Sequence, residues 1–227
     1  IAVLCTPLAA PIAARCPAVD AVFSYDPNVV RSPSWWFQPG GWRDLWDIVS
    51  RLRAERFDLA LSMHGEFACL LSWASGARHR VGYAQEGYPA LLTLAAPGRR
   101  YVQSFGHEVQ WNEHLAAAVG APAQQTVPYL LWNDCEASWL EGFLGEKSGQ
   151  EYVVLAPGAH NGSAKRYLLD SWATVANALA RDHGLRIVLT GTQGELPLVR
   201  ELAGQLEAPP LIAAGQTTVP QLLTLLQ

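Results

Sequence analysis

The sequence has few charged residues, and lysine is almost absent from it. Charged side chains make up 16% of the 227 residues, the formal net charge is -4, and Lys147 and Lys165 are the only lysines. A surface that binds nucleic acid needs an excess of basic side chains to neutralise phosphates. The composition therefore argues against nucleic acid as a partner. It also draws attention to Lys165, which lies in a glycine-containing loop.

Cysteine is sparse as well, and no two cysteines form a Cys-x-x-Cys pair. Each one lies in or beside an apolar segment, which is typical of buried free thiols rather than of a metal site or a disulfide framework. No stretch reaches the ~18 to 20 apolar residues of a membrane span, and the sequence shows no basic-then-apolar signal segment. We expect a cytoplasmic globular protein with no metal and no cofactor. The cysteines are Cys5, Cys16, Cys69 and Cys135.

Short apolar runs alternate with amphipathic stretches along the whole chain, which predicts parallel strands joined by crossover helices. Between residues 42 and 53, apolar side chains recur at helical spacing, and the segment Arg56-Phe57-Asp58 then leads into the next strand. The fold class is therefore α/β. The predicted strands are Ile1 to Cys5, Ala21 to Tyr25, Leu59 to Ser62, Arg80 to Tyr83, Tyr152 to Ala156, Arg186 to Thr190 and Leu211 to Ala213.

The polar run from Gly145 to Gln150 interrupts this alternation and reads as a linker between domains. It predicts a first α/β domain over residues 1–145 and a second over residues 146–227. Both ends of the sequence look abrupt, because the first residues already read as a buried strand and the last as a helix, whereas native termini usually fray into polar residues. We therefore expect a fragment of a longer protein.

The loop from Ala156 to Tyr167 carries the strongest local signal. It leaves a buried strand, contains Gly158 and Gly162, and ends in the pair Lys165-Arg166 before a helix. Backbone N–H groups, a helix amino end and fixed cations together favour an anion such as a phosphate or diphosphate. The spacing differs from that of a Walker loop. The alternative is a solvated loop with a basic pair on the surface.

A second candidate is the loop from Gly191 to Glu195, which also follows a strand. Glu195 is placed to accept hydrogen bonds from a ribose diol, as acidic residues do in nucleotide-binding α/β folds. The alternative is that it only stabilises the dipole of the helix that follows. In the later turn at Gly215, we expect Thr217 or Thr218 to cap the final helix.

The first domain offers weaker candidates. His64 and Glu66 lie in the loop after the strand Leu59 to Ser62, at the expected mouth of the sheet, although a lone histidine is more often structural. The clusters Arg78-His79-Arg80 and Arg99-Arg100 would suit an anionic acceptor or form a solvated face. The segment 35–42 holds three of the nine tryptophans and would contact a sugar or lipid, or pack against its own domain.

Taken in order, these motifs resemble glycosyltransferase family 9, the ADP-heptose:lipopolysaccharide heptosyltransferases. The resemblance covers nearly the whole chain and depends on the order and spacing of motifs rather than on one of them. In the second half they are Pro157-Gly158-Ala159, Ala164-Lys165-Arg166-Tyr167, the strand Arg186 to Thr190 with Gly191, and Ala214-Gly215-Gln216-Thr217-Thr218. In the first half they are Thr6 to Pro11, Phe57 to Leu61, Gly76 to Tyr83 and the helix opening at His107-Glu108-Val109.

The resemblance implies a GT-B architecture, in which two Rossmann-like domains contain parallel sheets and the second domain is incomplete here. The first domain would bind the lipopolysaccharide acceptor, and the second the nucleotide-sugar donor, with ADP-heptose expected. The implied reaction is inverting transfer, in which Lys165 stabilises the leaving diphosphate. The implied enzyme is a monomer at the cytoplasmic face of the inner membrane, with peripheral membrane contact. In the family frame Lys165 matches the lysine that lies against the donor's phosphates, and Glu195 falls near the acid that contacts the nucleotide. Together with the loop candidates, the expected substrate-binding residues are Gly158, Ala159, His160, Lys165, Arg166, Gly191, Glu195 and His64.

The sequence departs from the family pattern in three places. Leu168 stands where the family usually has the proline of Lys-x-Trp-Pro. The family's Gly-Asp segment, which supplies the general base, would lie before Ile1, and its Asp-x-Gly-x-x-His segment would lie after Gln227. We therefore expect the fragment itself to be inactive. The alternatives are a non-catalytic α/β binding module and a family member that uses another sugar nucleotide.

Overall fold

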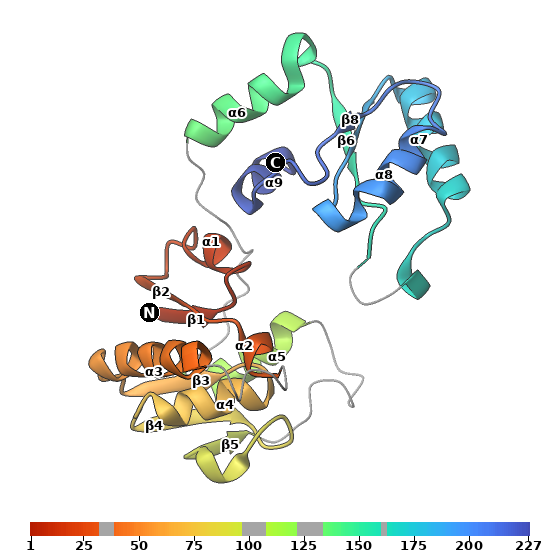
Figure 1. Cartoon of the computed structure of the whole chain (residues 1–227). Coiled ribbons are helices and arrows are strands. Elements are labelled where there is room, and N and C mark those ends of the chain that lie inside the picture. The colour runs from red at the N-terminus through yellow and green to blue at the C-terminus, as the bar shows by residue number, and fades with distance from the viewer. Residues whose placement is uncertain (32–38, 97–107, 122–133, 160–162) are drawn as a thin grey trace. The chain divides into compact units, whose positions relative to one another are not determined.

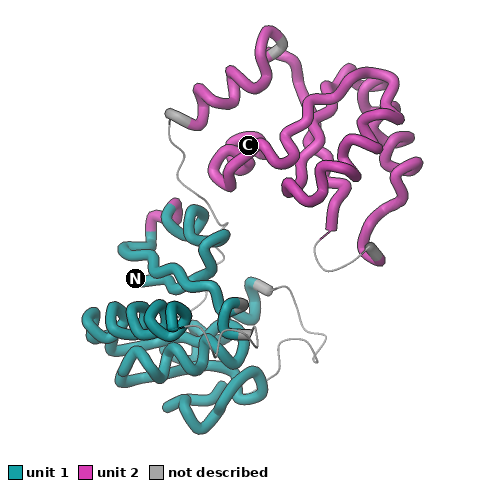
Figure 2. The backbone as a smooth tube through the Cα atoms, viewed as in Figure 1, with its two compact units in different colours: residues 1–14, 18–129 teal, residues 15–17, 130–227 magenta. Residues whose placement is uncertain are grey.

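The structure is a computed structural model that describes residues 1–31, 39–96, 108–121, 134–159 and 163–227. The chain divides into two compact units (Figure 2), the first formed by residues 1–14 and 18–129 and the second by residues 15–17 and 130–227. Each unit has its own parallel β-sheet structure and its own buried core. Within the described ranges, no helix is long and apolar enough to cross a membrane.

The first unit contains a parallel pair of strands and a parallel three-stranded sheet in the order β3-β4-β5 (Figure 1). Its strands are β1 (Ala2–Cys5), β2 (Ala21–Ser24), β3 (Leu59–Ser62), β4 (His79–Tyr83) and β5 (Leu94–Ala96). Its helices are α1 (Ala10–Ala13), α2 (Pro27–Arg31), α3 (Pro39–Ala54), α4 (Gly65–Ala74), α5 (Glu108–Ala117) and the short 3₁₀ turn η2 (Pro89–Leu91).

Helix α3 supplies much of the first core. Its apolar positions repeat at helical spacing, so Ile48, Val49 and Leu52 share one buried stripe. That stripe packs with Phe23 of β2 and Leu71 of α4. The helix predicted over residues 42–53 is therefore confirmed, with three more residues at its start and one at its end.

The second unit is built around the parallel sheet β6-β7-β8. Its strands are β6 (Tyr152–Leu155), β7 (Arg186–Leu189) and β8 (Leu211–Ile212). Its helices are α6 (Asp134–Leu144), α7 (Leu169–His183), α8 (Leu196–Ala203) and α9 (Val219–Leu225), with the 3₁₀ turns η3 (Gly145–Lys147), η4 (Ser163–Lys165) and η5 (Gln193–Glu195).

Alternating residues of β7 point to opposite faces of this sheet, as a strand requires. Ile187 and Leu189 pack with α7 and α8 on one face. Val188 packs with α6 and α9 on the other. Both faces are covered, and the segments 153–155 and 187–189 are continuously apolar, which is the pattern of a parallel sheet buried between helices.

The sequence located the strands closely but did not predict several other elements, among them β5 and α4. Each of the seven predicted strands is present, within one residue at either end. The strand β5 was not predicted, because its three residues, Leu94–Ala96, carry no β-branched or aromatic side chain. The helix α4 was missed because it begins at Gly65, directly after β3 and His64, in residues read as a loop.

The division into units falls earlier in the chain than the predicted boundary at residue 145. Helix α6, which that prediction assigned to the first domain, groups with the second unit. The physical reason is its aromatic face: Trp139 and Phe143 stack on each other with ring centroids 5.2 Å apart and pack against the cluster that contains Val188 of β7.

Candidate functional site

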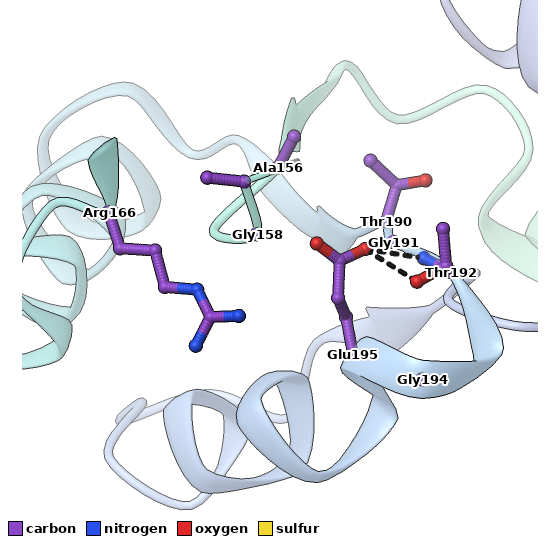
Figure 3. Close-up of a pocket in the computed structure, with 9 residues that line it drawn as sticks. Ala156, Gly158, Arg166, Thr190, Gly191, Thr192, Gly194 and Glu195 are labelled. Carbon is purple, nitrogen blue, oxygen red and sulfur yellow. Dashed lines mark hydrogen bonds between the residues drawn. The ribbon is translucent and has the colours of Figure 1, made fainter. Parts of the chain in front are cut away.

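A pocket of about 440 Å³ opens where β6 and β7 end. The two strands are adjacent and parallel, with Leu155 paired to Leu189, so the loops that follow them emerge side by side. Ligands of open parallel α/β sheets bind at this carboxyl edge. Figure 3 shows the residues that line the pocket, which are Ala156, Gly158, Ala159, Arg166, Thr190, Gly191, Thr192, Gly194 and Glu195.

Glu195 is held by the residue that opens the turn η5. The backbone N–H of Thr192 donates to Oε2 of Glu195 over 2.8 Å, and the Thr192 hydroxyl donates to the same oxygen over 2.8 Å. These are contacts of a Thr-x-x-Glu capping box, in which a side chain satisfies backbone N–H groups at a helix start. The Glu195 carboxylate is therefore fixed in the pocket before any ligand enters.

Two glycines make room for that carboxylate. A side chain at Gly158, in the loop after β6, would collide with Oε1 of Glu195. A Cβ at Gly191, in the loop after β7, would lie 3.3 Å from Oε2. The carboxylate thus fills the space between the two loops, with one oxygen bonded to Thr192 and the other facing Gly158 (Figure 3).

The surroundings of Glu195 favour its charged form. The pKa of its carboxyl is lowered first by the backbone N–H of Thr192 and then by the Thr192 hydroxyl. Desolvation opposes these two bonds less strongly, and the positive charge of Arg166 and the backbone N–H of Ala159 each lower the pKa by a smaller amount. The pocket therefore presents a stable carboxylate at neutral pH.

The two neighbouring cations take different positions. The Arg166 side chain extends from the ribbon toward the pocket that it lines (Figure 3). Lys165 is exposed at the end of η4 and is not among the lining residues. Of the loop residues that the sequence indicated, Gly158, Ala159, Arg166, Gly191 and Glu195 come together in this pocket. His160 lies outside the described residues.

Thr192 is the functional candidate that sequence reasoning passed over. The loop from Gly191 to Glu195 was noted for its glycines and its acid, and the threonine was given no role. The signal that would have identified it was the spacing Thr-x-x-Glu, which predicts reciprocal contacts at a helix start. The other lining residues without a predicted role are Ala156, Thr190 and Gly194.

His64 lies in the first unit, at the residue before α4. Its Nδ1 is 3.4 Å from Oε2 of Glu86, a contact that becomes an ion pair when the imidazole is protonated. The two residues follow β3 and β4, which are adjacent and parallel. The histidine is 59% exposed, whereas the side chain of Glu86 is only 12% exposed. Glu66 lies in the first turn of α4.

Arg80 has a structural role in the first unit. Its Nε donates to the carbonyl of Leu91 and its Nη1 to the carbonyl of Ala77, each over 2.7 Å. These bonds tie β4 to the turn η2 and use two of the five N–H donors of the guanidinium. Arg78 and His79 are exposed, while Arg99 and Arg100 lie outside the described residues.

The described residues contain no group of three or more metal-ligating side chains close enough to hold a metal ion. Three of the cysteines, Cys5, Cys16 and Cys69, are free thiols. Burial raises the pKa of the Cys5 thiol, which keeps it protonated and unreactive.

The fold and the pocket define an open parallel α/β protein with a ligand site at the carboxyl edge of its sheet. Residues 45–227 match the sequence profile of glycosyltransferase family 9 (heptosyltransferase). The chain belongs to that family. No curated protein sequence matches it.

Solved structures show the same architecture. An Escherichia coli ADP-heptose lipopolysaccharide heptosyltransferase II superposes with a TM-score of 0.74 at 22% identity, over 99% of this chain and 66% of its own. A family 9 glycosyltransferase from Veillonella parvula superposes with a TM-score of 0.74 at 15% identity, over 98% of this chain and 62% of its own. An Escherichia coli heptosyltransferase with ADP superposes with a TM-score of 0.71 at 18% identity, over 98% of this chain and 68% of its own.

The predicted fold class is thereby confirmed: two α/β units with parallel sheets, similar to GT-B heptosyltransferases. The chain spans about two thirds of the length of these structures. At these identities the likeness concerns the fold.

Proposed function

We propose that the full-length protein transfers a heptose, or a related sugar, from a nucleoside-diphosphate sugar to the inner core of lipopolysaccharide. The observation that carries the proposal is the pocket at the ends of β6 and β7, where an acid, a cation and two closely approached glycines meet. Family membership indicates glycosyl transfer, and the ADP in one similar solved structure favours ADP-heptose as the donor.

The donor nucleotide would use the two loops differently. Glu195 accepts hydrogen bonds from the ribose hydroxyls through the oxygen that faces Gly158. The diphosphate lies toward Ala159 and Arg166, where a guanidinium and backbone N–H groups favour negative charge. Lys165 is one residue from Arg166 and acts on the same diphosphate from the rim, because its flexible stem lets the ammonium reach inward.

The reaction is a displacement at the anomeric carbon. The oxygen of an acceptor hydroxyl forms a bond to that carbon while the bond to the diphosphate oxygen breaks, which inverts the configuration. The hydroxyl proton goes to a general base that we assign to no described residue. Negative charge grows on the leaving diphosphate, so fixed cations stabilise the transition state more than the ground state. Lys165 and Arg166 are the residues proposed for this role.

The acceptor would bind to the first unit, where His64 and Glu86 lie at the ends of two adjacent strands. Lipopolysaccharide precursors are anchored in lipid, so we propose that the enzyme works at the cytoplasmic face of the inner membrane through peripheral contact, as a monomer.

The test is sugar transfer from ADP-heptose by the full-length protein and by its Lys165→Ala, Arg166→Ala and Arg181→Ala variants. Arg181 is an exposed arginine in the last turn of α7 and serves as the matched control. We expect kcat to fall at least tenfold in the first two variants and to stay unchanged in the third. If Lys165→Ala and Arg166→Ala both keep the kcat of the wild type, the proposed roles of these cations are wrong. If the wild type itself transfers no sugar, the proposed function is wrong.

A further inference from the structure

The second unit contains two capping boxes of the same design. In the first, Thr192 donates from its backbone N–H and its hydroxyl to one oxygen of Glu195, each over 2.8 Å. In the second, Thr218 donates from the same two groups to Oε1 of Gln221, over 2.8 and 3.0 Å. One box follows β7 and the other follows β8.

The two boxes differ in the side chain that completes the cap. Gln221 caps the start of α9 with a neutral amide oxygen, so neither a charge nor a second oxygen is needed to begin a helix. Glu195 provides both. Thr192 and Glu195 line the pocket, whereas Thr218 and Gln221 are not among the lining residues.

Neither Thr192 bond uses Oε1 of Glu195. Both bonds go to Oε2, while Oε1 lies against Gly158, and the backbone N–H of Ala159 also stabilises the carboxylate. A carboxylate oxygen has two acceptor sites, so Oε1 can accept from a ligand hydroxyl beside these neighbours. A glutamate has three side-chain torsions, and a carboxylate held at one oxygen by two donors loses most of that freedom before binding. The arrangement therefore preorganises Oε1 as an acceptor.

We propose that Thr192 is a positioning residue, which holds the Glu195 carboxylate so that Oε1 accepts a hydrogen bond from a sugar hydroxyl of the bound nucleotide. The inference rests on the proposed function, since it needs a nucleotide in this pocket. The hydroxyl of Thr192 adds a second donor to its backbone N–H. The two donors together fix the position and the rotation of the Glu195 carboxylate, which the backbone N–H alone cannot do. Removing only the hydroxyl should loosen Glu195 while leaving the charge in place.

The test compares the binding of ADP with that of 2′,3′-dideoxy-ADP, which has the same base and phosphates but no ribose diol. Isothermal titration calorimetry on the full-length protein gives the affinity ratio for the wild type, Thr192→Val, Thr192→Ser and Thr218→Val. Valine keeps the shape of threonine without its hydroxyl, and serine keeps the hydroxyl. Thr218→Val removes the same capping hydroxyl at a helix that does not open at the pocket.

We expect the wild type to prefer ADP by about tenfold, the worth of one good hydrogen bond to a charged group. Thr192→Val should reduce that preference to about threefold or less, Thr192→Ser should restore it, and Thr218→Val should leave it unchanged. An unchanged ratio in Thr192→Val would show that Thr192 only caps η5, which overturns the inference and leaves the proposed function standing.

Two further results would distinguish a failure of this inference from a failure of the proposed function. If the wild type binds both nucleotides equally, Glu195 contacts no ribose hydroxyl, so Thr192 has no ligand group to serve and the inference fails while diphosphate binding remains. If the wild type binds neither nucleotide, the proposed function fails and the inference fails with it.

Discussion

The carboxylate of Glu195 lies so close to the Cα of Gly158 that any side chain at position 158 would collide with its Oε1 atom. The two residues come from the loops after β6 and β7, so their contact joins the two edges of the pocket. The contact also explains a glycine that needs no unusual backbone angle, because Gly158 is required for space rather than for a positive φ.

Replacing Gly158 by alanine should displace Glu195. We expect Gly158→Ala to lower the free energy of unfolding by about 1–3 kcal/mol, as overpacking does, and to weaken ADP binding at least tenfold. Gly149→Ala is the matched control, because Gly149 does not line the pocket and a Cβ there meets no atom within 4 Å.

A double-mutant cycle locates the cause of that loss. In a Glu195→Ala background the collision partner is gone, so Gly158→Ala should cost less stability there than in the wild type. Chemical denaturation of the four proteins measures the coupling. Equal costs in both backgrounds would show that the strain at position 158 has another origin.

Glu195→Gln should change how stability depends on pH. The pKa of Glu195 is lowered in the folded state, so its contribution to stability is present above the ordinary pKa of 4.5 and is lost as the pH falls through the folded value. Glutamine can keep the cap, as Gln221 does. We therefore expect the wild type to exceed the variant in unfolding free energy at pH 7, and the difference to shrink below pH 4.5 in urea titrations. A difference that stays constant with pH would contradict the assignment.

Arg80→Ala should destabilise the first unit by about 1–2 kcal/mol, because it leaves the carbonyls of Leu91 and Ala77 without their guanidinium donors. Arg78→Ala, at an exposed position two residues earlier, should leave the melting temperature unchanged. Differential scanning calorimetry makes the comparison. If Arg78→Ala lowers the melting temperature and Arg80→Ala does not, the structural role assigned to Arg80 is wrong.

Tyr152→Phe tests the attachment of α9 to the sheet. The Tyr152 hydroxyl donates to the carbonyl of Leu225, the last residue of α9, over 2.9 Å, and burial raises the pKa of this phenol. Losing the bond should cost about 1 kcal/mol of unfolding free energy. Tyr167→Phe, at a tyrosine that is 57% exposed, should cost much less in the same equilibrium denaturation.

The sequence allowed the strands and the capped final helix to be predicted because their signals are local. The runs Val153-Val154-Leu155 and Ile187-Val188-Leu189 are apolar and rich in β-branched residues. Thr218 and Gln221, three positions apart, define the cap of the final helix. The predicted cap at Thr217 or Thr218 is confirmed, at Thr218.

The site was harder to predict because it depends on which loops lie together. Gly158 and Glu195 meet only because β6 and β7 pair in one register, and no periodicity in the sequence encodes that contact. Glu195 was interpreted either as a helix-start acid or as a ligand-binding acid; it completes the capping box and lines the pocket, and its contact with a ligand stays a prediction. The sequence favoured Lys165 over Arg166 for contact with the diphosphate, but of these two residues only Arg166 lines the pocket.

The most direct test of the proposed donor site is a crystal structure of the full-length protein with ADP. The account predicts electron density for the diphosphate between the loop at Gly158 and the guanidinium of Arg166, with a ribose hydroxyl within hydrogen-bond distance of Glu195. ADP bound elsewhere, with the pocket at the ends of β6 and β7 filled only by solvent, would contradict it.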